Sequence, residues 1–263
     1  MKHRSLFFPA LAALLTALTA LTGCRSVPGS NRYQLLLTSS EEENQLGAEA
    51  YQQYKQKLKV SGNAAYNQAL TRVGTAIKNV APANDFAWEF LVFEDTTANA
   101  FCLPGGKVAV YSGIFPYIAN DAELACVVSH EIAHAIARHS GERMSWSALQ
   151  SAGAQAISSD SEVVQAIYGL GTNIGVMLPF SRTQESEADY LGLKMMAQAG
   201  YDPSAALSFW KKFGTDSGSK ISDWLSTHPG GSVRVADLEK HMSEAQELYS
   251  QAPTKRGLGN TLK

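Results

Sequence analysis

The sequence lacks an excess of charge, a set of evidently paired cysteines and, beyond its first residues, any long apolar run. Its 22 basic and 24 acidic side chains leave a formal net charge of −2, and the basic residues form no block. A nucleic-acid partner requires a clustered basic surface, so the composition argues against one. Nothing in the spacing of Cys102 and Cys126 demands a disulfide. We expect two buried apolar thiols, although an oxidising compartment would allow them to pair.

The long apolar run lies at the N-terminus, over residues 6–21, and follows a basic start. It is shorter than the roughly 20 residues that a membrane-spanning helix needs. This layout predicts a secretory signal peptide over residues 1–23. Its last three residues and the cysteine that follows, Leu-Thr-Gly-Cys24, resemble the lipobox of bacterial lipoproteins. The resemblance implies lipid attachment to Cys24 and a periplasm-facing position in the cell envelope, and Arg25 favours the outer membrane.

Removal of this segment leaves about 240 residues, which is enough for one substantial domain. We expect a polar, lipid-proximal tether over residues 24–38, because the stretch carries proline, glycine and serine. The domain itself is expected over residues 39–250. Residues 251–263 are expected to form a flexible tail.

Capping residues, apolar spacing and chain breakers locate the helices and strands. We expect a strand over 86–92 and a hairpin over 99–111 before the central helix. Six helices are expected over 39–59, 64–80, 121–140, 183–198, 205–213 and 233–249. Residues 140–179 predict two further helices with a break near 158–160. These form either a mobile lid or, as is more frequent, a packed helical hairpin.

The helix over 121–140 carries the motif His130-Glu131-Ile132-Ala133-His134. Two histidines four residues apart project from the same helix face, one turn apart. That spacing lets both imidazoles bind one zinc ion. Glu131 follows the first histidine, where it is placed to hold a water molecule and accept its proton.

The hairpin over 99–111 precedes this helix. A strand beside a metal-binding helix offers backbone N–H and C=O groups to which an extended peptide adds. We therefore expect Asn99 and Ala100 to bind the substrate backbone. The alternative is an ordinary hairpin that only packs the core.

A catalytic zinc usually has three protein ligands and one open position, so two histidines are not enough. The segment Ser181 to Asp189 supplies a candidate. On the helix that follows it, Glu185 and Asp189 are four residues apart and share one face, whereas Glu187 points away from it. One helix face thus presents two carboxylates towards the histidines.

Several of these motifs together resemble the M48 metallopeptidases. They are Asn-Ala-Phe-x-Leu-Pro-Gly-Gly, His-Glu-x-x-His and Ser-Arg-x-x-Glu-x-Glu-Ala-Asp, in this order. The family includes Oma1-like membrane proteases and bacterial periplasmic lipoprotein proteases. The resemblance implies an α+β, mainly helical, zincin-like fold with a small sheet over the active-site helix. It implies one Zn²⁺ per chain, bound by His130, His134 and Glu185. Asp189 would accept a hydrogen bond from a ligand imidazole.

A further family feature is Thr-His-Pro-x-x-x-x-Arg, which falls on residues 227–234. By resemblance, His228 approaches the metal and Arg234 lies near it. His228 either stabilises the oxyanion of the reaction or fills the open position as a removable fourth ligand. His139 and His241 have no such motif around them, and we expect both on the surface.

These observations predict a membrane-tethered zinc endopeptidase that hydrolyses unfolded or misfolded envelope proteins. The alternative is a chaperone or assembly factor for outer-membrane proteins. It would use the same groove, contact the outer-membrane assembly machinery and have its proteolysis restrained by His228. Loss of cleavage without loss of binding in Glu131→Gln would separate the two.

Overall fold

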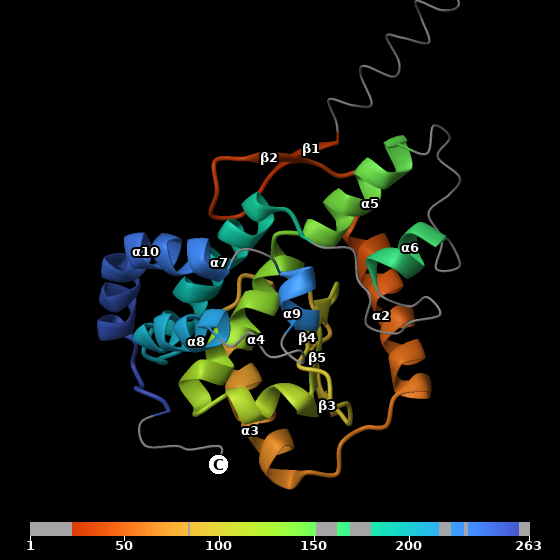
Figure 1. Ribbon diagram of the computed structural model, residues 1–263. Helices are drawn as coiled ribbons and strands as arrows, with labels where there is room; N and C mark the ends of the chain where they lie inside the picture. The colour runs from red at the N-terminus through yellow and green to blue at the C-terminus, as the bar shows by residue number, and fades with distance from the viewer. Residues whose placement is uncertain are drawn as a thin grey trace, which may run out of the picture.

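The computed structural model describes residues 23–83, 85–150, 162–168, 180–215, 222–228 and 231–257. Helices surround one small sheet in this part of the chain (Figure 1). The predicted signal peptide lies outside the described residues, apart from Gly23. Among the residues described, no helix has the length and apolarity to cross a bilayer.

The chain enters the domain through two capped helices. Helix α2 (Ser40–Lys57) begins at Ser39, whose hydroxyl accepts from the Glu42 N–H while the Glu42 carboxylate accepts from the Ser39 N–H. This reciprocal capping satisfies two backbone donors at the helix start. Helix α3 (Ala64–Lys78) is capped by Asn63. Both helices lie where the sequence predicts them.

The main sheet has the strand order β3 (Glu89–Phe93), β5 (Lys107–Tyr111), β4 (Ala100–Leu103). β4 and β5 form the expected antiparallel hairpin, and β3 runs parallel to β5. The predicted strand over 86–92 begins three residues later in the structure, at Glu89, because Phe86 to Trp88 pair with no strand. β4 is the edge strand of this sheet on the side opposite β3.

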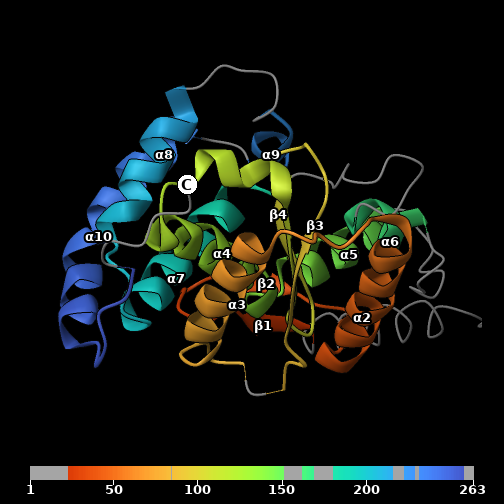
Figure 2. The same cartoon turned by 90° about the horizontal axis from the view of Figure 1, so that it is seen from below.

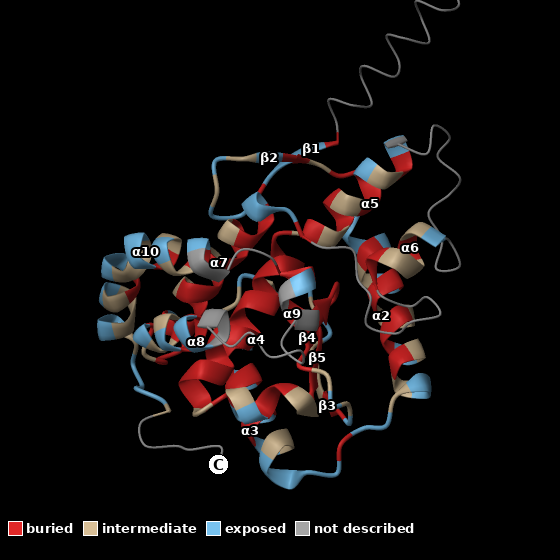
Figure 3. Cartoon of the chain, viewed as in Figure 1, coloured by how far each residue is buried: buried red, intermediate tan, exposed pale blue. Residues whose placement is uncertain are grey.

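Both faces of this sheet are covered by helices, as Figure 2 shows. Successive side chains on a strand point to opposite faces. Val108 and Val110 of β5 join the core shared with α3 and α4 (Asp121–Ile136), whereas Ala109 and Tyr111 join the core shared with α2. α4 thus lies against the sheet, and every one of its residues is buried (Figure 3).

The predicted helix over 121–140 is in fact two helices. α4 begins after its N-cap, Asn120, and ends at Ile136. Arg138 has φ +57, and α5 (His139–Gln150) then starts in a new direction. A left-handed residue cannot continue a helix. The Arg138 guanidinium donates to Glu43 and to the Thr38 carbonyl, which fixes the turn.

The remaining helices complete the body around α4. They are α6 (Glu162–Ile167), α7 (Arg182–Gln198), α8 (Ser204–Thr215), α9 (Ser222–Thr227) and α10 (Gly231–Gln251). α7 makes the most extensive contact with α4, and α10 packs on α7 and α8. A short 3-10 helix, η1 (Ser112–Tyr117), joins the sheet to α4. The predicted break near 158–160 lies outside the described residues.

Two terminal segments are more ordered than the sequence predicts. Residues 24–38 were expected to be only a tether, but β1 (Cys24–Ser26) and β2 (Tyr33–Leu35) pair as an antiparallel ribbon. Val27 and Leu36 are buried, and Gln34 donates to the Ala137 carbonyl. A few isolated apolar residues in a polar stretch anchor this ribbon, which is why composition alone did not reveal it.

The second correction concerns the tail, expected to be flexible over 251–263. Residues up to Gly257 pack on the turn between α7 and α8. The Arg256 N–H donates to the Gly200 carbonyl at 2.7 Å, and its Nε donates to the Ala199 carbonyl at 3.0 Å. Only the part of the tail after Gly257 lies outside the described residues.

Candidate metal centre

α4 brings the two motif histidines to one point. The Nε2 atoms of His130 and His134 lie 3.1 Å apart, and both side chains are buried. Glu131 lies beside them and accepts a hydrogen bond on Oε1 from Trp224 Nε1 at 3.2 Å. Burial raises the pKa of Glu131, although the neighbouring His228 and His130 partly oppose this. A carboxylate with a raised pKa is suited to accept and return a proton.

α7 supplies the carboxylates that the sequence predicts on one face. Ser181 and Gln184 form a reciprocal cap at its start. One turn on, the Glu185 oxygens lie 3.4 Å from His134 Nε2 and 3.6 Å from His130 Nε2. Because His130 and His134 present Nε2 to Glu185, both face the same space as that carboxylate.

A glycine allows α7 to lie this close to α4. A Cβ on Gly192 would meet the backbone N of His130 at 3.0 Å and its Cα at 3.1 Å. Such contacts are shorter than ordinary van der Waals distances, so a larger residue would push the two helices apart. The distance between the histidine helix and the carboxylate helix therefore depends on this residue.

His228 follows α9 and reaches the same point. Its N–H donates to the Trp224 carbonyl, and its Nδ1 lies 3.1 Å from Glu185 Oε1 and 3.2 Å from His130 Nε2. The ring is 1% exposed. His130, His134, Glu185 and His228 each offer one ligand atom, and these four atoms all lie within 4.8 Å of one another.

Arg234 of α10 and Asp189 of α7 enclose the group from behind. Arg234 donates to both Asp189 oxygens, at 2.7 and 2.5 Å, and its guanidinium stacks on Trp210. Asp189 Oδ1 lies 3.1 Å from His130 Nδ1. This contact fixes the ring of His130 so that Nε2 faces the group. Carboxylates commonly orient metal-binding histidines in this way.

The electrostatics of the group suit a cation. Burial lowers the pKa of His134 well below its usual value, which keeps that imidazole neutral. Burial and Arg234 also lower the pKa of His130, but hydrogen bonds with Asp189 and Glu185 outweigh them and raise it to about 9. For Glu185, burial raises the pKa, yet His228 and Arg234 hold it well below its usual range. A metal ion would compete with the proton on His130 for the same lone pair.

The residues present fit a zinc ion. Tetrahedral zinc with bonds of about 2.0–2.1 Å places its ligand atoms about 3.3 Å apart. The separations that involve His130 or Glu185 are 3.1–3.6 Å, and all four ligand atoms lie within 4.8 Å of one another. Glu185 Oε2 is buried, and Arg234 Nη1 lies 2.8 Å away as its ion-pair partner.

The predicted substrate residues lie on the edge strand beside α4. Asn99 directly precedes β4, and its side-chain Oδ1 accepts from the Ala100 N–H at 2.9 Å. The Asn99 carbonyl accepts from Tyr111 on β5, so Asn99 also ties β4 into the sheet. Both residues are buried. A hollow beside the metal group is lined by β4 and by residues of α4 and α5, together with Tyr168, Phe180 and His228.

The structure corrects the prediction for His139, which is not on the surface but 0% exposed. Its Nδ1 lies 2.8 Å from Nδ1 of His134, and its Nε2 lies 3.1 Å from Glu187 Oε2. Glu187 does point away from the metal group, as expected, but into this buried contact. His139 lies five positions after His134, a spacing that no single helix face explains. Only the turn at Arg138 brings them together.

His241, also predicted on the surface, is half-buried and lies against the Tyr190 ring. Sequence reasoning also missed Trp224, which donates a hydrogen bond to Glu131, and Phe180, which stacks on the His134 ring. Aromatic residues are common in cores, so their type alone gave no signal. Cys102 and Cys126 are both buried, and neither forms a disulfide, which agrees with the expectation of two apolar thiols.

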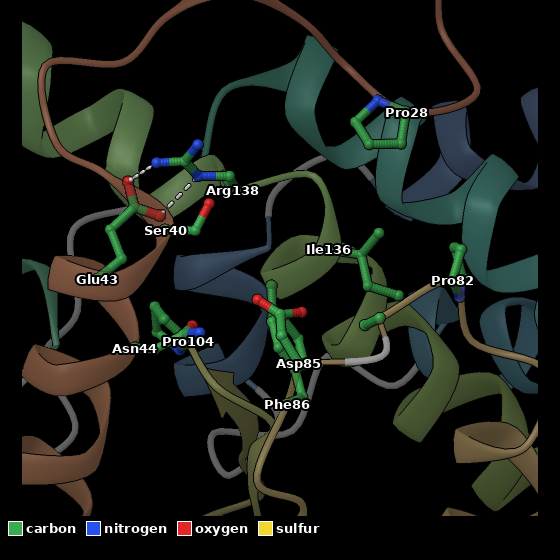
Figure 4. Close-up of a pocket in the computed structure, with 12 residues that line it drawn as sticks. Pro28, Ser40, Glu43, Asn44, Pro82, Asp85, Phe86, Pro104, Ile136 and Arg138 are labelled. Carbon is green, nitrogen blue, oxygen red and sulfur yellow. Dashed lines mark hydrogen bonds and ion pairs between the residues drawn. The ribbon is translucent and has the colours of Figure 1, made fainter.

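A second hollow lies between α2, the loop before β3 and the N-terminal ribbon (Figure 4). Pro28, Pro82 and Ile136 border it, and the Glu43–Arg138 ion pair closes one side. No residue of the metal group lines this hollow, so it does not compete as the chemical centre.

A buried helix that presents His-Glu-x-x-His to a carboxylate from a later helix, beneath a small mixed sheet, defines a metallopeptidase with a zincin-like fold. The chain belongs to peptidase family M48, whose profile matches residues 64–242. The predicted fold class and the resemblance are therefore confirmed.

Relatives of known name agree with this assignment. The chain is 35% identical to the mitochondrial metalloendopeptidase OMA1 of Schizosaccharomyces pombe over 84% of this chain and 67% of that protein. It is 40% identical to OMA1 of Arabidopsis thaliana over 65% of this chain and 35% of that protein. It is 26% identical to the beta-barrel assembly-enhancing protease of Escherichia coli over 80% of this chain and 46% of that protein. The latter two relatives are much longer than the matched part.

Proposed function

We propose that this protein is a membrane-tethered zinc endopeptidase that hydrolyses peptide bonds of unfolded proteins in the cell envelope. The observation that carries the proposal is the convergence of four ligand atoms beside Glu131. His130, His134 and Glu185 would hold the zinc ion. The metalloendopeptidase names of several relatives support the reaction class.

Each residue around the proposed metal site has a distinct role in peptide hydrolysis. When bound, zinc would supply a Lewis acid at the scissile carbonyl. Glu131 accepts the proton of the attacking water and returns it to the leaving amine. Trp224 donates to Glu131 Oε1 at 3.2 Å and so fixes the carboxylate beside the ligands. Arg234 and Asp189 hold the His130 ring in place from the far side.

The substrate is proposed to bind in an extended form along β4. This strand is the sheet edge nearest α4. The Ala100 N–H already meets an acceptor, Asn99 Oδ1, so a substrate carbonyl would displace that side chain. Phe101, Leu103 and Phe180 line the hollow beside the metal group. This hollow holds no more than about one water molecule, so it would have to widen to accept an apolar side chain of an unfolded substrate.

Attachment to a membrane is proposed through a lipid on Cys24. The support is the lipobox-like sequence and the exposed position of Cys24 at the start of β1. Such an anchor would hold the domain on the periplasmic side of a bacterial membrane, and Arg25 favours the outer membrane. The relatives include a mitochondrial and a bacterial protease, which agrees with a membrane-associated role in general.

A matched pair of α4 variants tests the activity. Glu131→Gln should abolish cleavage of an unfolded reporter protein while the zinc content stays near one per chain. Glu123→Gln is the control, because Glu123 is equally buried on the same helix but pairs with Lys212. It should cut normally. Cleavage by Glu131→Gln at the wild-type rate would refute the mechanism.

A second candidate function is an assembly factor for outer-membrane proteins with restrained proteolysis. One observation favours it: His228 offers a fourth ligand atom beside the other three, and the whole group is at most 3% exposed. Bound to the metal, it would exclude a substrate carbonyl or water. The name of the Escherichia coli relative, a beta-barrel assembly-enhancing protease, supports the same idea. In this case Glu131→Gln would retain binding of unfolded outer-membrane proteins and promote their assembly.

A further inference from the structure

We propose that His139 is a positioning residue of the metal centre. It holds His134 in the tautomer that leaves Nε2 free for the metal, and it is itself held by Glu187 and by Arg32 of the N-terminal ribbon. This inference rests on the proposed function in one respect, namely that His134 binds a metal through Nε2.

The contact between His134 and His139 forces a choice of tautomer. Their Nδ1 atoms lie 2.8 Å apart, so one of them carries a hydrogen and the other accepts it. Nε2 of His134 lies 3.1 Å from His130 Nε2 and 3.4 Å from Glu185 Oε1. A metal ligand must present a bare lone pair there, which places the hydrogen of His134 on Nδ1. His134 is then the donor and His139 the acceptor.

The other side of His139 is consistent with this assignment. If Nδ1 of a neutral His139 accepts, its hydrogen is on Nε2. That nitrogen lies 3.1 Å from Glu187 Oε2, a carboxylate oxygen that can only accept. Every hydrogen along the line from His134 through His139 to Glu187 therefore has an acceptor. In the reverse arrangement, His134 would carry its hydrogen on Nε2 and aim it at the ligand group.

Glu187 is fixed by donors from the ribbon. Arg32 donates to both of its oxygens, through Nε and Nη2, each at 2.8 Å, and Ser30 Oγ donates to Oε1 at 2.9 Å. Arg32 also pairs with Glu142 on α5. Glu187 is surrounded by donors, so its carboxylate remains the acceptor for His139. The turn that joins β1 to β2 thus helps to orient a metal ligand, His134.

The two motif histidines are oriented in different ways. His130 Nδ1 contacts a carboxylate, Asp189, directly, whereas His134 reaches its carboxylate, Glu187, through a second imidazole. Loss of such orienting partners typically costs about 10–100-fold in metal affinity. The expected effect of removing His139 is therefore a loss of zinc affinity without the loss of any ligand.

Three variants of the full chain test this role. His139→Leu removes the acceptor but keeps an apolar volume, and it should lower zinc affinity about 10–100-fold in competition with a chromogenic chelator. His139→Asn returns an acceptor oxygen near the position of Nδ1 and should restore most of the affinity. Glu187→Gln should lose several-fold. Glu123→Gln is again the buried ion-pair control and should bind zinc as the wild type does.

A spectroscopic measurement separates orientation from general destabilisation. In ¹⁵N-labelled protein, ring nitrogen shifts should report the Nδ1–H tautomer for His134 in the wild type and in His139→Asn. Unchanged zinc affinity and an unchanged tautomer in His139→Leu would overturn the inference. If that variant does not fold, equal zinc affinity of Glu187→Gln and Glu123→Gln would overturn it instead. A wild-type chain that binds no zinc would refute the proposed function as well, and this result is distinguishable from the others.

Discussion

Replacement of Gly192 by alanine is predicted to disturb the metal centre by separating two helices. The added Cβ would lie 3.0 Å from the His130 N and 3.1 Å from its Cα, whereas ordinary contacts are 3.4–4 Å. α7 must therefore move away from α4 by about 0.4 Å. Functional constellations must be held to within about 0.5 Å, so this shift takes up most of that margin. Because Glu185 and His130 lie on the two separated helices, we expect zinc affinity to fall about tenfold.

The effect of this substitution on stability is smaller and partly compensated. Alanine in a helix interior gains about 1 kcal/mol over glycine. Overpacking of a filled core costs about 1–3 kcal/mol. The net loss is about 1 kcal/mol, which corresponds to a Tm lower by about 2–4 °C for a domain of this size. The zinc affinity of Gly192→Ala should therefore change more than its free energy of unfolding.

Gly62→Ala provides the control, because its Cβ would meet nothing within 4 Å. It should change the free energy of unfolding by less than about 0.5 kcal/mol and leave zinc affinity unaltered. Chelator competition and thermal unfolding measure the two quantities for each variant. Wild-type zinc affinity in Gly192→Ala would refute the argument that helix separation sets the ligand geometry.

Four other predictions follow from the same geometry. Glu185→Ala should lose zinc, as measured by metal analysis, and should not cut unfolded protein. His228→Ala should raise proteolysis if the ring acts as a removable fourth ligand, whereas a fall of about 10²–10³ in turnover would assign it to the oxyanion instead. Cys24→Ser should leave the chain unprocessed or outside the membrane fraction, and normal fractionation would contradict the lipid anchor. Removal of residues 252–263 deletes two hydrogen bonds of Arg256 and should lower the free energy of unfolding by about 1–3 kcal/mol in a denaturant titration.

The parts of the site that the sequence predicts are those carried by helical spacing. His130 and His134 are four residues apart on one helix, as are Glu185 and Asp189 on another, and each pair shares a face. The periodicity of a helix thus fixes which side chains can act together. His228 was found only through a short motif, because a residue after a helix has no such periodic constraint.

The missed features depend on contacts between distant segments. Nothing local in the sequence indicates that the helix breaks at Arg138, since its turn is fixed by Glu43 and Thr38 from the other end of the domain. His139 was misplaced for this reason. The sequence does not indicate the ribbon of β1 and β2, because strands of three residues are too short to show an alternating pattern.

The ribbon also determines how the domain would stand on a membrane. β1 begins at Cys24 itself, so a lipid on that thiol would be joined to the first residue of a paired strand, with no slack between them. A domain attached without a flexible linker would reach only a short distance from the membrane, and its orientation relative to the membrane would be nearly fixed. It would act on chains that emerge at or pass along the membrane surface, and proteins in the open periplasm would meet it only when they diffuse to that surface.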